Sequence, residues 1–177
     1  MTKYFVKLVL VLFGFFINSP KAAEQVTIQM LLEKGIVIIE TYPSKAPKTV
    51  KRITELINQG FYDGLTFHRV ISGFMAQGGD PLGNGTGGSG KNIVAEFNDI
   101  KHERGIVSMA RSNDPDSADS QFFICFAEAS HLDGQYTVFG QVVEGMEFVD
   151  KIKRGEPGSG SVDEPDEMIT VRVISDL

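Results

Sequence analysis

Residues 67–80 read Phe67-His68-Arg69-Val70-Ile71-Ser72-Gly73-Phe74-Met75-Ala76-Gln77-Gly78-Gly79-Asp80. This stretch places one cation, Arg69, and one amide, Gln77, among large apolar side chains, and it ends in two glycines and an aspartate. Apolar neighbours favour burial, yet an arginine is almost never buried without a partner. Arg69 therefore either forms an internal ion pair or lines a pocket, and the second alternative predicts a functional surface.

The size and composition of the whole chain favour one globular domain. The chain has 177 residues, of which 42% are hydrophobic and 23% charged, enough to bury a sizeable core. Its formal net charge of -6 argues against a general nucleic-acid binder, because such a protein needs a basic surface to neutralise phosphates. We therefore expect no nucleic-acid partner.

Residues 1–23 form a separate unit of the sequence. A basic start precedes the apolar run of residues 8–17, which is shorter than the roughly 20 residues that a membrane-spanning helix needs. Small and polar residues follow up to position 23, which is typical of a secretory signal peptide. We expect cleavage there and a mature domain of residues 24–177 that does not associate with membranes. Because Pro20 or Lys21 stands where cleavage sites carry a small residue, an uncleaved anchor is the alternative.

The chain contains a single cysteine, Cys125, so it cannot form an intrachain disulfide. Cys125 lies in the apolar run of residues 121–126, which predicts a small buried hydrophobic side chain. A nucleophilic cysteine would need a neighbouring base, and the sequence shows no recognisable pairing with a histidine.

The mature chain is predicted to be mainly β. Runs rich in β-branched and aromatic residues, several of them alternating, predict about eight strands. These strands are expected over residues 26–33, 36–42, 65–70, 74–77, 105–110, 121–126, 137–143 and 168–174. Regular spacing and only two helices predict a closed eight-stranded antiparallel barrel whose ends the helices cover.

Two helices are predicted between these strands. The first opens at Pro47 in its first turn, with Ser44 as a candidate N-cap, and ends at Gly60. The second is expected over residues 144–153, where apolar residues recur on one helical face.

The loop Gly85-Thr86-Gly87-Gly88-Ser89-Gly90-Lys91 nearly matches a phosphate-binding loop. That motif ends in Ser or Thr and opens a helix, whereas Asn92 and the strand-like run of residues 93–97 follow here. We therefore interpret it as a flexible loop whose glycines let the backbone approach a ligand closely.

No metal site or cofactor is predicted. Three aspartates of one polar loop lack the spacing of a calcium loop, and the three histidines are too dispersed to indicate zinc. These residues are Asp114, Asp116, Asp119, His68, His102 and His131.

Several motifs together resemble the cyclophilin-type peptidyl-prolyl cis-trans isomerases. They are residues 67–80, the loop Gly83-Asn84-Gly85-Thr86-Gly87-Gly88 and the run Ser120-Gln121-Phe122-Phe123-Ile124, with shorter matches at residues 108–110, 132–134 and 138–140. They occur in the family's order over essentially all of the mature chain. The resemblance implies an eight-stranded antiparallel barrel capped by two helices, in agreement with the strand count.

The resemblance also implies the activity and the residues that carry it. An X–Pro peptide bond rotates over a barrier of roughly 18–20 kcal/mol, and no covalent bond is made or broken, so no cofactor is needed. The catalytic residues implied are Arg69, Gln77 and Phe74, with the Arg69 guanidinium stabilising the twisted amide and Gln77 positioning it.

The residues implied in binding the substrate are Phe67, Met75, Ala110, Arg111, Gln121, Phe122, His131, Leu132 and Tyr136. Apolar members would seat the proline ring, and the backbone at Ala110 and Arg111 would pair with the extended peptide. Strand alternation alone would send Phe74 and Met75 to opposite faces. Phe122 and Met75 could instead belong to the core.

Three residues depart from the family's commonest pattern. His131 stands where the family often carries Trp, Tyr136 where it often carries His, and Arg111 where it often carries Asn. We expect isomerase activity to survive and cyclosporin to bind weakly. The departures resemble bacterial members, which together with the signal peptide favours a periplasmic enzyme. An inner-membrane anchored or a secreted protein is the alternative.

Two classes of function fit these observations. The first is a monomeric folding catalyst acting on proline-containing segments of unfolded or folding exported proteins. The second is a binding module that docks such segments without turning them over. The pairing of Arg69 with Gln77 favours the enzyme, because binding alone would not need the donor.

Overall fold

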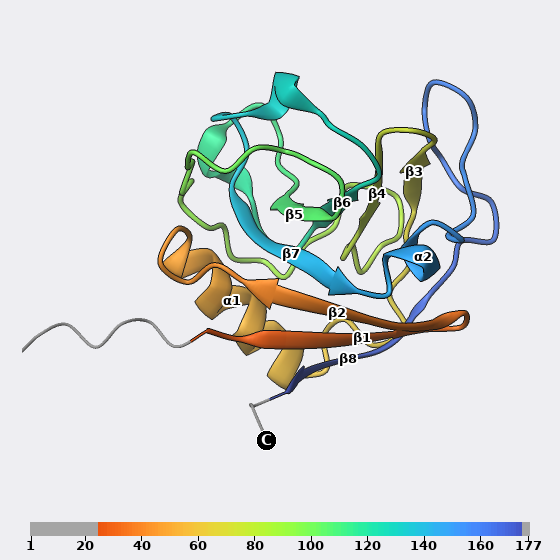
Figure 1. The fold of residues 1–177 in the computed structure, drawn as a ribbon, viewed down its shortest axis with the longest axis horizontal. Coiled ribbons are helices and arrows are strands. Elements are labelled where there is room, and N and C mark those ends of the chain that lie inside the picture. Colours follow the sequence, from red (N-terminus) through yellow and green to blue (C-terminus); the bar gives the residue numbers. More distant parts are fainter. Residues whose placement is uncertain (1–24, 175–177) are drawn as a thin grey trace, which may run out of the picture.

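The computed structural model describes residues 25–174, so the predicted signal peptide and anchor lie outside the described residues. Eight strands and two helices make up the fold (Figure 1). The strands are β1 (Thr27–Leu32), β2 (Gly35–Thr41), β3 (Arg69–Ile71), β4 (Met75–Gly78), β5 (Ile106–Met109), β6 (Phe122–Cys125), β7 (Val138–Glu144) and β8 (Met168–Ile174). The helices are α1 (Pro47–Asn58) and α2 (Met146–Val149). Among these residues no helix is long and apolar enough to cross a membrane.

The eight strands form one antiparallel sheet in the order β3-β4-β6-β5-β7-β2-β1-β8. The predicted closed barrel is wrong, because β3 and β8 stand at opposite edges and share no ladder. The structure is an open half-barrel. Two isolated β-bridges lie on this side of the sheet: Thr66 pairs with Glu167, and Arg69 pairs with Ser161.

The sheet stays open because another segment occupies the free edge of β3. The Val70 N–H donates to Gly160 O at 2.7 Å, and the Gly155 N–H donates to Val70 O at 2.9 Å. The Val162 N–H donates to His68 O at 3.2 Å. Residues 155–162 thus satisfy the backbone groups that β8 would need for closure.

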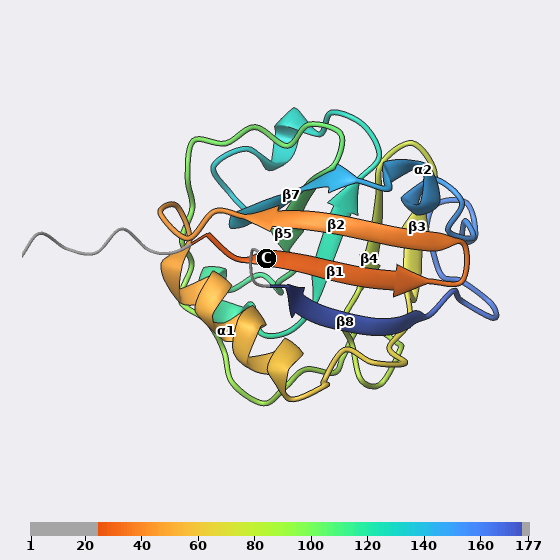
Figure 2. The same cartoon turned by 60° about the horizontal axis from the view of Figure 1, so that its bottom comes forward.

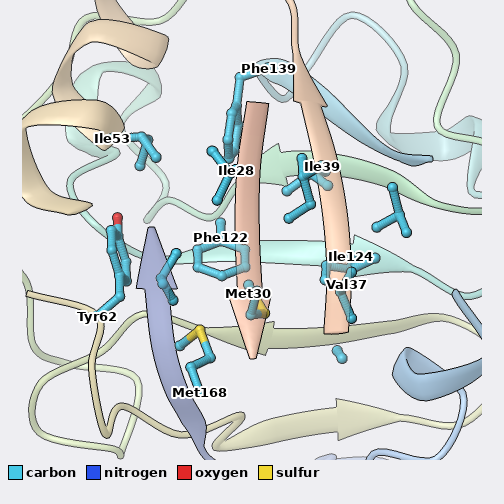
Figure 3. Packing of buried hydrophobic residues seen from close by; sticks show 14 of the residues in the cluster. Ile28, Met30, Val37, Ile39, Ile53, Tyr62, Phe122, Ile124, Phe139 and Met168 are labelled. Atoms are coloured by element: carbon cyan, nitrogen blue, oxygen red, sulfur yellow. The ribbon is translucent and has the colours of Figure 1, made fainter. Parts of the chain in front are cut away.

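The core lies between the concave side of the sheet and α1. Side chains alternate along β1, so Ile28 and Met30 point inward while their neighbours are partly exposed. Figure 3 shows them packed with Ile39 of β2 and Ile53 of α1. Figure 2 shows α1 along the side of the sheet that carries β8 and β1. This packing leaves the opposite end of the sheet, at β3, β4 and β6, free to carry a site.

Helix α1 begins where predicted but is capped differently. Ser44 is not its cap: the N-cap residue is Ala46, which makes no side-chain cap hydrogen bond. The Glu96 carboxylate instead accepts from the backbone N–H groups of Lys48 at 3.0 Å and Thr49 at 2.8 Å. The segment 93–97, expected to be strand-like, forms no strand and supplies this distant cap.

Helix α2 is shorter than predicted, with one turn at Met146–Val149 in place of residues 144–153. Gly145 precedes it with φ of 81°, in the left-handed region, and a Cβ there would lie 2.1 Å from Ile36 O. The close approach to β2 therefore requires glycine at position 145. Its left-handed backbone conformation separates the end of β7 from the first residue of α2.

Candidate active site

The hairpin of β3 and β4 places Arg69 and Gln77 directly opposite one another. Arg69 Nη1 donates to Gln77 Oε1 at 3.1 Å, and Arg69 Nε donates to the carbonyl of Ser159 at 3.1 Å. Within residues 25–174 Arg69 forms no salt bridge. Of the two alternatives for this arginine, the structure supports the pocket rather than the internal ion pair.

A chain of amide groups holds Gln77 in place. Gln77 Nε2 donates to Gln121 Oε1 at 2.9 Å, and Gln121 Nε2 donates to the carbonyl of Gly87 at 2.8 Å. Because each carbonyl oxygen in this chain accepts from the preceding group, the orientation of the Arg69 guanidinium is fixed before any ligand arrives.

A pocket of about 350 Å³ opens beside this guanidinium, and its lining combines apolar side chains with polar and charged ones. Most residues predicted for the site meet there, brought from five separate segments of the chain. Its lining consists of Arg69, Phe74, Met75, Gln77, Ala110, Arg111, Phe123, His131, Leu132 and Tyr136. Gln121 lies next to it and lines an adjoining hollow of about 270 Å³.

Two predicted binding residues, Phe67 and Phe122, lie in the core instead. Phe67 is 0% exposed and Phe122 is 5% exposed, and their ring centroids are 6.4 Å apart in an edge-to-face arrangement. Phe123 takes the place expected of Phe122. The sequence carried a signal for this, because Gln121 and Phe123 are two residues apart and share one face of the strand.

Phe74 and Met75 both line the pocket although they are adjacent in sequence. Strand β4 begins at Met75, so Phe74 belongs to the preceding turn and strand alternation does not apply to it. The Phe74 ring lies 5.4 Å from that of His131, centroid to centroid. His131 therefore forms part of the wall opposite the hairpin.

Arg111 and Tyr136 form the remaining wall as one unit. The Arg111 guanidinium carbon lies 4.6 Å from the centroid of the Tyr136 ring, and Arg111 Nη2 donates to the carbonyl of Gln135 at 2.9 Å. The Ala110 N–H donates to Gln121 O at 2.9 Å. Within residues 25–174 the carbonyl of Ala110 and the N–H of Arg111 make no hydrogen bond, so these two groups can pair with an extended peptide.

A buried polar network that sequence reasoning missed supports the pocket from behind. His102 is 1% exposed, and its ring stacks against that of Phe123 at a centroid distance of 6.1 Å and an interplanar angle of 17°. Its Nδ1 lies 3.0 Å from Asp133 Oδ1 and its Nε2 lies 3.1 Å from Ser108 Oγ. Burial lowers the pKa of His102, although the hydrogen bond to Asp133 opposes this. The contact with Asp133 spans 31 residues, so no local pattern could have revealed it.

This network is structural and provides no nucleophile. Ser108 is 0% exposed, and its hydroxyl donates to the carbonyl of Thr137 at 2.9 Å, away from any cavity. Cys125 is likewise fully buried, and burial raises the pKa of its thiol to about 12, which confirms its expected role as a small apolar side chain.

Carboxylates hold the glycine-rich loop next to the pocket. Asp80 accepts from the N–H groups of Leu82 at 2.8 Å and Asn84 at 3.1 Å, and Asp119 accepts from those of Ser89 and Gly90, each at 2.9 Å. Burial would raise the pKa of Asp80, but these and neighbouring backbone donors lower it below its usual value. These carboxylates therefore hold the loop that was expected to be flexible, and most of its backbone N–H groups already have an acceptor.

Comparison with known families matches this chain to one of them. The profile of the family described as "Cyclophilin type peptidyl-prolyl cis-trans isomerase/CLD" matches residues 26–174. A "Probable peptidyl-prolyl cis-trans isomerase" of Brucella abortus is 45% identical over an alignment of 174 positions that covers 90% of this chain and 89% of that protein. "Peptidyl-prolyl cis-trans isomerase B" of Bacillus subtilis is 50% identical over 129 residues, 71% of this chain and 90% of that one.

Solved structures agree with the sequence matches. A cyclophilin-type peptidyl-prolyl cis-trans isomerase of Cryptosporidium parvum, crystallised in the presence of the dipeptide Ala-Pro, superimposes with a TM-score of 0.78 at 30% sequence identity. The superposition covers 85% of this chain and 99% of that one. The chain thus belongs to the cyclophilin-type peptidyl-prolyl cis-trans isomerases, enzymes that interconvert the cis and trans forms of the peptide bond before proline.

Proposed function

We propose that this isomerase acts on proline-containing segments of exported proteins while they fold. The observation that carries the proposal is the guanidinium of Arg69, fixed by Gln77 at the edge of a pocket with apolar side chains in its lining. A proline ring seats against the apolar lining, and the Ala110 carbonyl and the Arg111 N–H pair with the peptide backbone on either side. This recognition demands little of the surrounding sequence.

In the twisted transition state the prolyl nitrogen becomes pyramidal and regains a lone pair. A guanidinium donor aimed at that nitrogen stabilises the twisted amide more than either planar form. Arg69 Nη1 and Nε are engaged by Gln77 and Ser159, so the guanidinium is held without reorganisation when the bond turns. A turnover of about 10–1,000 per second requires lowering the barrier by roughly 4–7 kcal/mol, which positioning and one charged donor can supply.

The test of this mechanism compares Arg69→Ala and Arg69→Lys with the wild type in isomerisation of a proline peptide. We expect kcat/KM to fall about 10²- to 10³-fold in Arg69→Ala, as for removal of one transition-state donor. Arg69→Lys keeps the charge but loses the planar fork, so it recovers only part of the activity. Equal activity in all three proteins would refute the mechanism. If the biological role survived without isomerisation, the chain would act as a binding module.

The location we propose is the periplasm, with the domain acting as a monomer. The support for the periplasmic location is the composition of residues 1–23, with its basic start and short apolar run. Fractionation of cells making the full chain, followed by N-terminal sequencing, tests this. A mature N-terminus near residue 24 in the periplasmic fraction is expected. Recovery of the intact chain in the membrane would support the anchor, and its recovery in the medium would support secretion.

A further inference from the structure

A polar cavity of about 440 Å³ borders the proline pocket on the side of Arg69. It shares Arg69, Gln77 and Arg111 with that pocket, and Ser159, Ser161 and Val162 of the segment that covers the edge of β3 also line it. Figure 1 shows this segment beside β3. Its lining consists of His68, Arg69, Gln77, Gly83, Asn84, Gly85, Arg111, Ser159, Ser161 and Val162. A side chain of a bound peptide can therefore enter it while proline occupies the neighbouring pocket.

The lining of this cavity carries positive charge and no carboxylate. Arg69 and Arg111 both contribute to it, and neither forms a salt bridge within the part of the chain that the structure describes. By contrast, Arg104 and Arg172 are each paired with a carboxylate, at 2.6 Å and 2.7 Å. A chain of formal net charge -6 thus keeps two uncompensated guanidinium groups at one cavity.

The other hollow beside the site differs in charge. The hollow of about 270 Å³ includes Asp119 in its lining as well as Arg111, so it does not favour an anion in the same way. Asp80 interacts electrostatically with His68, but it does not line the polar cavity. Its carboxylate oxygens accept from backbone N–H groups of the glycine-rich loop. Positive potential is therefore concentrated on the Arg69 side.

Several hydrogen-bond donors around the cavity lack a partner within residues 25–174. Asn84 Oδ1 accepts from the N–H and the hydroxyl of Thr86, which orients the amide and leaves its Nδ2 without a partner. Arg69 Nη2 and the Ser161 hydroxyl are also without a partner among the described residues. His68 is 6% exposed, and neither of its ring nitrogens has a hydrogen-bond partner there. Such a set of donors suits a carboxylate, which only accepts.

We propose that this cavity is a subsite for the carboxylate of an Asp or Glu side chain near the substrate's proline. The proposal rests on the proposed isomerase function and narrows its substrates to proline segments with a neighbouring acidic residue. The cavity and the proline pocket adjoin, since they share Arg69, Gln77 and Arg111. An extended chain advances about 3.3–3.6 Å per residue, so we expect the acidic residue within about two positions of the proline.

The test uses matched peptides that contain one proline and either Glu or Gln at each of the two positions before and after it. All of these carry blocked termini, and one further peptide without an acidic side chain ends in a free C-terminal carboxylate. We expect a Glu/Gln ratio of kcat/KM of about 2–5 at one position, a size typical of a partly exposed charged contact, and a smaller ratio in high salt. The neutral peptides should be turned over in every case.

Two variants on opposite walls of the cavity locate the effect. Asn84→Asp has the same shape and keeps the acceptor for Thr86 but replaces the donor by a charge. Ser161→Asp adds a charge on the other wall, with Ser161→Asn as its matched neutral control. We expect both Asp variants to bring the Glu/Gln ratio to one or below, while Ser161→Asn keeps it above one. The ratio is the readout, so a change in overall activity does not obscure it.

The outcomes separate this proposal from the proposed function. Activity on Gln peptides with no Glu preference at any position would overturn the subsite and leave the isomerase intact. A preference that both Asp variants leave unchanged, or one seen only for the free terminal carboxylate, would also overturn it. Absence of activity on every peptide would instead count against the proposed function.

Discussion

The ring of His102 stacks on that of Phe123, with the two planes 17° apart, so a buried polar residue forms the back of the proline pocket. The opposite edges of His102 are tied to Asp133 and Ser108. This couples the shape of an apolar wall to a hydrogen-bond network that the substrate never touches.

Replacing His102 should therefore affect both stability and catalysis. We expect His102→Ala to lower the free energy of unfolding by about 2–4 kcal/mol, because it leaves a cavity and removes a partner of Asp133. The loss of support behind Phe123 should raise KM more than it lowers kcat. Urea unfolding and peptide kinetics measure the two effects. His102→Phe keeps the stacked ring, and we expect it to restore KM but not stability. Unchanged KM in His102→Ala would contradict the coupling.

The neighbouring phenylalanines of β6 are equally buried, each 5% exposed, but of the two only Phe123 lines the pocket, so their replacement should differ in its effect on catalysis. Phe123→Leu removes ring contact with the substrate, and we expect kcat/KM to fall about tenfold, corresponding to about 1.4 kcal/mol. Phe122→Leu faces the core, and we expect a loss of about 1 kcal/mol in the free energy of unfolding with kcat/KM within about twofold of the wild type. The reverse assignment of effects would show that Phe122 faces the substrate.

The stability of the fold should decrease as the solution becomes acidic. Burial lowers the pKa of both His68 and His102, so the unfolded chain takes up protons at these residues before the folded chain does. Their contribution is present above an unfolded pKa of about 6.5 and is lost as pH falls below it, by at most about 1.4 kcal/mol per pH unit for each histidine.

Urea unfolding between pH 8 and pH 5 measures this dependence, and His68→Gln should reduce its slope. Hydrogen bonds from the backbone and the ring of His102 lower the pKa of Asp133 to about 2. The contribution of Asp133 to stability is therefore lost only at far lower pH, below the pKa of this carboxyl in the unfolded chain. A free energy of unfolding that stays constant from pH 8 to pH 5 would contradict the lowered pKa of these histidines.

The distant cap of α1 should contribute to stability and not to catalysis. We expect Glu96→Ala to lower the free energy of unfolding by about 0.5–2 kcal/mol, since two N-terminal N–H groups lose their acceptor. Glu103→Ala removes an exposed carboxylate that makes no hydrogen bond within residues 25–174, and it serves as the control. Thermal unfolding together with kcat/KM tests this. Equal melting temperatures for the two variants would argue against the cap.

Inhibition by cyclosporin should be weak and should increase in His131→Trp. His131 gives the wall a smaller ring than the tryptophan that the family often has, with less apolar area. Inhibition of peptide isomerisation by the two proteins measures the difference. Sub-micromolar inhibition of the wild type would contradict the expectation.

Local pattern predicted most of the strands and the first helix, because alternation and helical spacing are properties of short segments. What it missed depends on contacts between distant segments. The closed barrel was wrong because residues 155–162 occupy the edge of β3, and no periodicity announces that pairing. Glu96 caps a helix 47 residues away for the same reason.

The prediction named Phe122 as a pocket residue where the structure has Phe123, and this error has a different origin. A shift of one residue along a strand sends every side chain to the other face. Family resemblance identified the run Gln121-Phe122-Phe123 correctly, but the strand period, counted from Gln121, was needed to choose between its two rings. Arg69, Gln77 and Met75 lie where the resemblance implied, because short turns fix the register of their hairpin.

The segment 155–162, which keeps the half-barrel from closing, also protects this enzyme from its own substrates. Unfolded chains present unpaired strands, and an open sheet edge is a template on which such strands add and aggregate. Here residues 155–162 already form hydrogen bonds with the backbone groups along the outer edge of β3. At the other edge, Asp63 accepts from the N–H of Val171 in β8 at 2.9 Å. An isomerase built this way can hold extended peptides at its pocket without offering them a strand to join at its β3 edge.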